Sequence, residues 1–169
     1  MAFIPRSPVL GLIWLMTSMT KHALAIASSI SAVLAAGTIA LTASPAHADD
    51  TICRTSIGAV AIDGDVVVPS GAWCELKGTR VDGNVKVKSG GTLKAKGVIV
   101  DGNVEGEGHR RVVVAPLNGT RSVIDGNIQV KQGGGGRIVR STVNGDIQVF
   151  SNSGRFKIKR NTVDGNLQC

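Results

Sequence analysis

The stretch RVDGNVKV, residues 80–87, decides the fold, because close variants of it recur along the chain. Asp-Gly between alternating valines is, taken alone, typical of a β-hairpin. Yet the chain continues with VIVDGNVEG (98–106), SVIDGNIQV (122–130), STVNGDIQV (141–149) and NTVDGNLQC (161–169). One turn written this often indicates a repeat architecture.

The spacing of these turns is nearly constant. Their central glycines are Gly64, Gly83, Gly102, Gly126, Gly145 and Gly165, separated by 19, 19, 24, 19 and 20 residues. The long gap holds HRRVVVAPLNGTRS (109–122), in which Pro116 and Asn118-Gly119 predict a loop. We therefore expect the extra residues to leave one repeat as a single outward loop.

Apolar and polar residues alternate around each turn. The positions two before and two after each glycine are Val, Ile or Leu throughout, and the residues between are mostly charged or amide side chains. A period of two predicts half-buried strands. No stretch after residue 48 has a helical period.

Two architectures use such a pattern: an antiparallel β-meander, and an all-β, single-stranded parallel β-solenoid of about six coils of ~19 residues. The constant gap favours the solenoid, because each coil must match the perimeter of the coil below. Each DGN is then a corner. We expect its glycine to relieve the bend and its Asp and Asn side chains to bond to local backbone.

Residues 57–169, with segments such as VDGNVKVKSGGTLKAKGVIVDGNV (81–104), resemble the bactofilins, bacterial polymer-forming cytoskeletal proteins. The resemblance implies a right-handed β-helix, self-assembly by stacking coil on coil, and no enzymatic activity. Bactofilins are typically cytoplasmic, whereas this chain begins with an export-like segment. Small secreted bacterial proteins of unknown role look similar too.

The N-terminal segment predicts export. Residues 23–42 are apolar, Lys21 precedes them, and Ala46-His47-Ala48 fits a signal-peptidase site. We expect residues 1–48 to be a signal peptide, with Met16 or Met19 as the alternative start, and a retained membrane anchor as the alternative fate. The remaining domain, residues 49–169, carries 17 Lys and Arg against 12 acids, and we expect it to be secreted or held at the cell surface, with no membrane span.

Three cysteines lie in this domain. Cys53 precedes Cys74 by 21 residues, about one coil, which predicts a disulfide between the first two coils under oxidising conditions. Cys169 is the last residue of the chain and follows the valine pattern. No capping segment follows it, so we expect end-to-end stacking of copies or a Cys169-linked dimer, with a buried thiol in a frayed end as the alternative.

The basic residues suggest a partner. Lys77 and Lys96 are equivalent in the repeat, Lys94 shares their outward face, and Lys86 and Lys88 occupy another. Such rows could bind an anionic wall polymer, or simply keep the protein soluble. Nucleic acid is disfavoured, because the domain has three aromatic residues and no interleaving of aromatic with basic side chains.

Little else indicates chemistry. His109 is expected to be a solvated loop residue, and KQGGGGRIV (131–139) a flexible corner without the features of a phosphate loop. The Asp and Asn columns are better explained as corners than as calcium ligands. We therefore expect no catalytic, metal or cofactor site. The predicted function is a secreted, non-enzymatic, self-assembling structural protein at the bacterial surface; the alternative is a monomeric module that binds anionic wall polymer.

Overall fold

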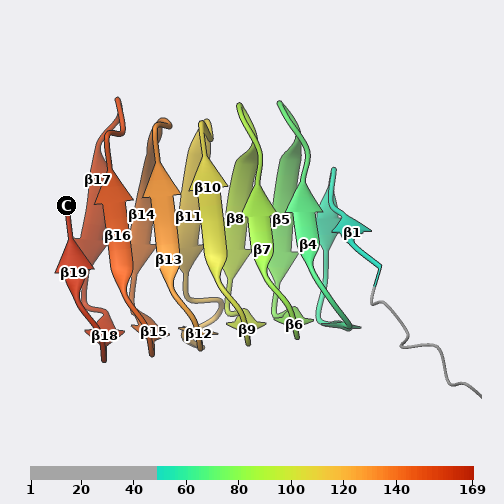
Figure 1. Cartoon of the computed structure of the whole chain (residues 1–169). Helices are drawn as coiled ribbons and strands as arrows, with labels where there is room; N and C mark the ends of the chain where they lie inside the picture. Colours follow the sequence, from blue (N-terminus) through green and yellow to red (C-terminus); the bar gives the residue numbers. More distant parts are fainter. Residues whose placement is uncertain (1–48) are drawn as a thin grey trace, which may run out of the picture. The chain divides into compact units, whose positions relative to one another are not determined.

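The computed structural model describes residues 49–169, and the predicted signal peptide lies outside the described residues. These residues form a β-solenoid of about six turns, drawn in Figure 1. Every strand pair between named strands is parallel, so the meander is excluded. Among residues 49–169, no helix is long and apolar enough to cross a membrane.

Each coil contributes one strand to each of three sheets, which we call sheets A, B and C. Sheet A consists of β1 (Thr51–Ile52), β4 (Val66–Val68), β7 (Val85–Val87), β10 (Val104–Glu107), β13 (Ile128–Lys131), β16 (Ile147–Phe150) and β19 (Leu167–Gln168). Sheet B consists of β2 (Ser56–Ile57), β5 (Trp73–Lys77), β8 (Thr92–Lys96), β11 (Arg111–Ala115), β14 (Gly135–Val139) and β17 (Phe156–Lys159). Sheet C consists of β3 (Ala61–Ile62), β6 (Arg80–Val81), β9 (Ile99–Val100), β12 (Ser122–Ile124), β15 (Ser141–Val143) and β18 (Thr162–Val163).

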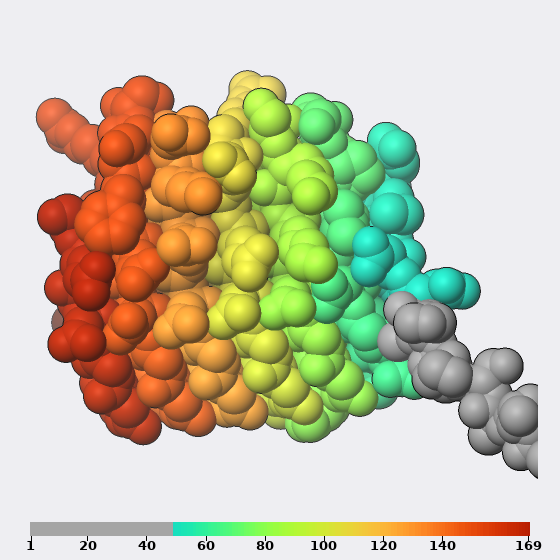
Figure 2. All heavy atoms as spheres, viewed as in Figure 1, coloured from blue at the N-terminus to red at the C-terminus, as the bar shows by residue number. Residues whose placement is uncertain are grey.

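The strand register is the one that the repeat predicts. Val66 pairs with Val85, Val85 with Val104, and Val104 with Ile128. These side chains point inward and are fully buried. Stacked β-branched side chains fill the interior, and each contributes about 1.5–3 kcal/mol by leaving water. Figure 2 shows the coils as successive bands along the solenoid.

The 24-residue repeat keeps the same perimeter by looping out its extra residues. β11 still pairs with β8 and β14, and β12 still pairs with β9 and β15. Between Ala115 and Ser122 the chain makes a tight turn closed by two backbone hydrogen bonds between Leu117 and Thr120. The predicted single outward loop is therefore confirmed.

The DGN triplets are corners between sheets C and A, as predicted. Most of their glycines, however, are required by close packing between coils and not by the backbone conformation of the bend. Of the six, only Gly64 adopts the left-handed conformation that favours glycine, with φ of 104°. At Gly102, an added Cβ would lie 2.6 Å from both Oδ1 of Asn84 and the carbonyl oxygen of Gly83 in the coil below. The glycine is needed because successive corners stack too closely for a side chain.

The residue after each glycine builds a ladder along this corner. The backbone N–H of Asn103 donates to Oδ1 of Asn84 at 2.9 Å, and that of Asn127 donates to Oδ1 of Asn103 at 2.7 Å. The same bond recurs in other coils and joins Asp65, Asn84, Asn103, Asn127, Asp146 and Asn166. These side chains bond to the next coil rather than to local backbone, so the corners help to lock one coil on another.

Candidate functional site

The predicted basic row lies on one face but is partly neutralised. Lys77 and Lys96 are paired across β5 and β8, as the repeat predicts. Between them lies Glu75, whose side chain is 10% exposed; its Oε1 is 2.8 Å from Nζ of Lys96 and its Oε2 is 3.2 Å from Nζ of Lys77. The hydrogen bond from Lys96 lowers the pKa of the Glu75 carboxyl. Both lysines therefore stabilise a buried carboxylate as well as facing solvent.

Lys94 projects from the same face of β8 and lies over the indole ring of Trp73, with Nζ 5.6 Å from the ring centroid. A cation–π contact of this kind contributes about 0.5–1 kcal/mol at an exposed site. The structure thus brings Lys77, Lys94 and Lys96 together, but gives each of them a neighbour within the fold.

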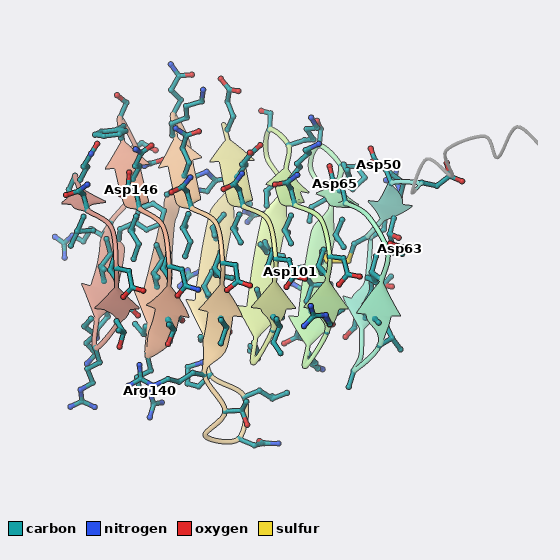
Figure 3. The ribbon with its side chains drawn as sticks, turned by 60° about the horizontal axis from the view of Figure 1, so that its bottom comes forward. Asp50, Asp63, Asp65, Asp101, Arg140 and Asp146 are labelled. Carbon is teal, nitrogen blue, oxygen red and sulfur yellow. A yellow bond between two sulfur atoms is a disulfide. The ribbon has the colours of Figure 1, made fainter. Side chains whose placement is uncertain are left out.

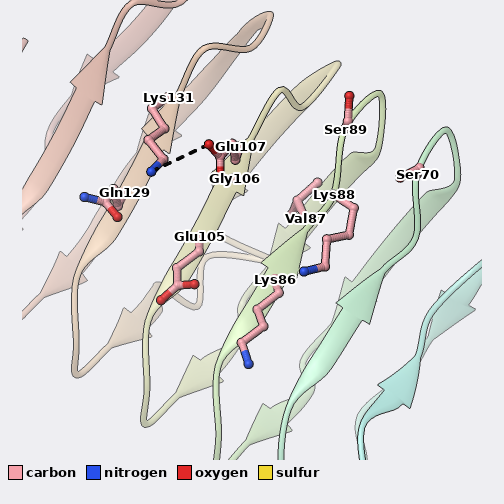
Figure 4. A pocket seen from close by; sticks show the side chains of 10 residues that line it. All are labelled: Ser70, Lys86, Val87, Lys88, Ser89, Glu105, Gly106, Glu107, Gln129 and Lys131. Carbon is pink, nitrogen blue, oxygen red and sulfur yellow. Dashed lines mark ion pairs between the residues drawn. The ribbon is translucent and has the colours of Figure 1, made fainter.

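The second predicted pair, Lys86 and Lys88, lines a groove of about 510 Å³ on the outer face of sheet A, shown in Figure 4. Lys86 is ion-paired with Asp65. The groove also contains Glu105, and Nζ of Lys131 lies 3.7 Å from Oε1 of Glu107. Its charges are mixed, so this groove is not a cationic surface.

The sequence analysis missed a stronger basic group in the last two coils. Five exposed cations, which we call the C-terminal basic cluster, line a groove of about 310 Å³: Arg137, Arg140, Lys157, Lys159 and Arg160. Arg137 and Lys157 are paired across β14 and β17, and Val139 lies opposite Lys159 in the next outward position. No salt bridge involves any of the five within residues 49–169.

The cations of this cluster repel one another. Lys157 lowers the pKa of Lys159, with smaller effects from Arg160, Arg137 and Arg140. The sequence signal was present in GRIVR (136–140) and GRFKIKR (154–160), where basic residues alternate with apolar ones at equivalent repeat positions. The lysine rows were predicted from the first three repeats, whereas the C-terminal basic cluster lies in the last two coils.

The final strands form a second candidate surface. β19, β17 and β18 are the last strands of sheets A, B and C, and within residues 49–169 nothing pairs with their outer edges. Leu167 is 54% exposed, whereas its equivalent in the preceding coil, Ile147, is fully buried. Phe150, which is 39% exposed, lies instead in the outward column of Lys131. We call this surface the terminal edge.

The predicted disulfide is present. Cys53 and Cys74 are bonded with their Cα atoms 5.5 Å apart, and the bond ties the first coil to the second. Cys169 is a free cysteine; it follows the core register opposite Val149 but is exposed at the terminal edge. Its predicted intermolecular bond stays a prediction.

Replacing both disulfide cysteines, Cys53→Ala with Cys74→Ala, should lower the free energy of unfolding by about 2–4 kcal/mol, because the disulfide restricts the unfolded chain across a loop of about twenty residues. Urea unfolding followed by circular dichroism measures this. Cys169→Ser is the control and should unfold as the parent does. Equal stability of all three proteins would show that the disulfide contributes nothing.

The prediction for His109 was wrong. Its side chain is 1% exposed and its ring packs edge-on against Phe156, with ring centroids 5.8 Å apart. Neither ring nitrogen has a hydrogen-bond partner among the described residues. An added Cβ at Gly133 would collide with this ring, which explains part of the glycine run. That run is also not a flexible corner throughout, because Gly135 and Gly136 belong to β14.

Burial lowers the pKa of His109 below its ordinary value of 6.5. The folded state therefore favours the neutral ring, and the stability this provides is full above pH 6.5 and is lost as the pH falls toward the folded pKa. We expect the urea midpoint of the parent to drop between pH 7.5 and pH 5.5, and His109→Leu to remove most of that drop. An equal drop in both proteins would contradict this assignment.

No group of three or more metal-ligating side chains gathers within residues 49–169. Comparison of the chain with protein-family models, with curated proteins and with solved structures finds no match. The function is therefore inferred from the strand edges and surface charges of the solenoid.

Proposed function

We propose that this protein is a non-enzymatic structural element that assembles by stacking its terminal edge on another copy. The observation that carries the proposal is the set of three strand edges, of β17, β18 and β19, that are unpaired within residues 49–169 and lie beside exposed Leu167. Unpaired edges present rows of free N–H and C=O groups, which natural proteins normally cover or protect.

The side-chain ladders support stacking. The Asn and Asp ladder ends within the described residues at Asn166, whose Oδ1 stands where each earlier member accepts a backbone N–H. A second ladder joins Nε2 of Gln129 to Oε1 of Gln148 at 2.9 Å, and Gln168 is next in that register. A further coil from another copy would extend both ladders, as identical amide side chains do in stacked sheets.

The first coil offers a second stacking surface. β1, β2 and β3 have two residues each, as do β18 and β19, and their outer edges are also unpaired within residues 49–169. The first coil is also tied down by the Cys53–Cys74 disulfide. The first coil can therefore receive the terminal edge of another copy, which allows growth beyond a dimer.

The bactofilin resemblance agrees with assembly by coil stacking, and membership of that family is part of the proposal. On the basis of the export-like segment before residue 49, we propose that the assembly lies at the bacterial surface. The alternative function, binding of anionic wall polymer through Lys77, Lys94 and Lys96, is weakened by the shared Glu75.

Light scattering of the purified protein across concentration, with and without reductant, tests the proposal. Growth to large particles that persists in reductant is the expected result, because strand pairing needs no disulfide. A compact monomer at every concentration would overturn the proposal. A dimer that disappears in reductant would replace it with simple Cys169 cross-linking.

A further inference from the structure

The side chains of the C-terminal basic cluster are exposed on the outer surface of the solenoid. Its five cations surround Val139, which is 3% exposed and forms the floor of the groove. The acids of the same coils, Asp146 and Asp164, belong to the DGN corner between sheets C and A. Figure 3 shows Asp146 and Arg140 toward opposite edges of the solenoid.

Two arginines of the cluster occupy a strained backbone position. Arg140 and Arg160 have φ of 49° and 58°, in the left-handed region. They follow β14 and β17 at the corner that the earlier coils make with Gly78 and Gly97, whose φ values are 66° and 58°. Left-handed backbone disfavours residues that carry a Cβ, and such strain often marks functional positions. Glycine would adopt this left-handed backbone with less strain than arginine. We therefore infer that the two arginine side chains contribute to a function other than folding.

The spacing of the charges suits an extended anion. Neighbouring parallel strands are about 4.8 Å apart, so the β14 and β17 cations form two closely spaced rows. Three of the five are arginines, whose planar guanidinium groups bind phosphate in a bidentate manner. A polyanion would also relieve the repulsion among these cations, which have no acidic partner within residues 49–169.

The lining residues narrow the class of ligand. The groove contains no aromatic side chain on which a base could stack, which disfavours single-stranded nucleic acid. We propose that the C-terminal basic cluster binds a linear polymer carrying repeated phosphate groups. The proposal goes beyond structural assembly and identifies a site different from the predicted lysine rows.

The test uses Arg140→Gly with Arg160→Gly, which removes two cations and places glycine where the backbone favours it. Binding of fluorescently labelled inorganic polyphosphate is measured by anisotropy, beside thermal unfolding. We expect Kd to rise at least about tenfold, because hydrogen bonds to ionised groups contribute this much. The unfolding temperature should stay equal or rise.

Gln132→Gly with Ser151→Gly is the matched control. These residues also have left-handed φ values, 53° and 51°, but carry no charge and lie at the corner after sheet A strands. The control should relieve similar strain and leave Kd unchanged. Equal Kd for parent, test and control variants would overturn the proposal, and so would loss of binding only in Lys77→Gln with Lys94→Gln and Lys96→Gln.

Two further probes identify the source of the phosphate. Unlabelled poly(glycerol phosphate) and unlabelled polyphosphate should both displace the labelled polyphosphate. The polymer with the lower Kd identifies the class of the natural ligand. Polyglutamate of equal charge tests for charge alone, because arginine side chains also bind carboxylates in a bidentate manner; competition as strong as that of polyphosphate would contradict a preference for phosphate. A thymidine oligonucleotide that binds more tightly at equal phosphate number would contradict the proposal and indicate a nucleic-acid site.

Discussion

Gly102→Ala should destabilise the solenoid by about 3 kcal/mol or more, because the added methyl group would overlap both the Asn84 side chain and the Gly83 backbone. Relief of this overlap requires the two coils to separate. Separation breaks the hydrogen bond of 3.0 Å from the Gly102 N–H to the Gly83 carbonyl and the adjacent ladder bond to Asn84. Chemical unfolding monitored by circular dichroism gives the change in free energy.

Gly58→Ala is the matched control for this substitution. Gly58 has no atom within 4 Å of an added Cβ, and its φ lies outside the left-handed region. Its stability should change by less than about 0.5 kcal/mol, as at ordinary surface positions. If Gly102→Ala were as stable as Gly58→Ala, the close stacking of the DGN corners would be wrong.

Leu167→Lys should abolish assembly while leaving the solenoid folded. Leu167 ends an inward column, yet it is 54% exposed, so a charge there costs the isolated domain little. Stacking of another copy would bury that charge without a partner, which is strongly unfavourable. Sedimentation velocity should show a monomer at concentrations where the parent forms particles.

Thr162→Lys adds the same charge to the neighbouring last strand β18, but at an exposed outward position that belongs to neither side-chain ladder. We expect this control to retain assembly, with at most a shift to higher concentration. Equal assembly of both variants would show that the terminal edge is not the contact surface. Loss of assembly in both would indicate only long-range charge repulsion.

The repeat allowed the fold to be predicted because its constraints are local and recurrent. Alternation around each DGN fixed which side chains are buried, and Val81, Val85 and Val87 are buried as predicted. Constant spacing fixed the pairing register and therefore the Cys53–Cys74 disulfide. The extra residues of the irregular repeat could be assigned to a loop, since the perimeter of a coil cannot change.

Three features that could not be predicted from the sequence depend on contacts between different coils. The need for glycine at Gly102 arises from a neighbour 19 residues earlier, not from its own conformation. His109 is flanked by arginines, and Gly106 together with Gly133 of the next coil makes room for its ring. The neutralising role of Glu75 toward Lys77 and Lys96 likewise needs side-chain positions.

Hydrogen exchange measured on dilute and on assembled protein tests the central claim most directly. Assembly through the terminal edge predicts that those amides of β17, β18 and β19 that point away from the preceding coil exchange freely in the monomer and become protected on assembly, because their free edges acquire partners. Amides of β7 and β8 should be equally protected in both states. Protection gained outside the first and last coils, or exchange in the last coil that does not change with concentration, would contradict assembly by coil stacking.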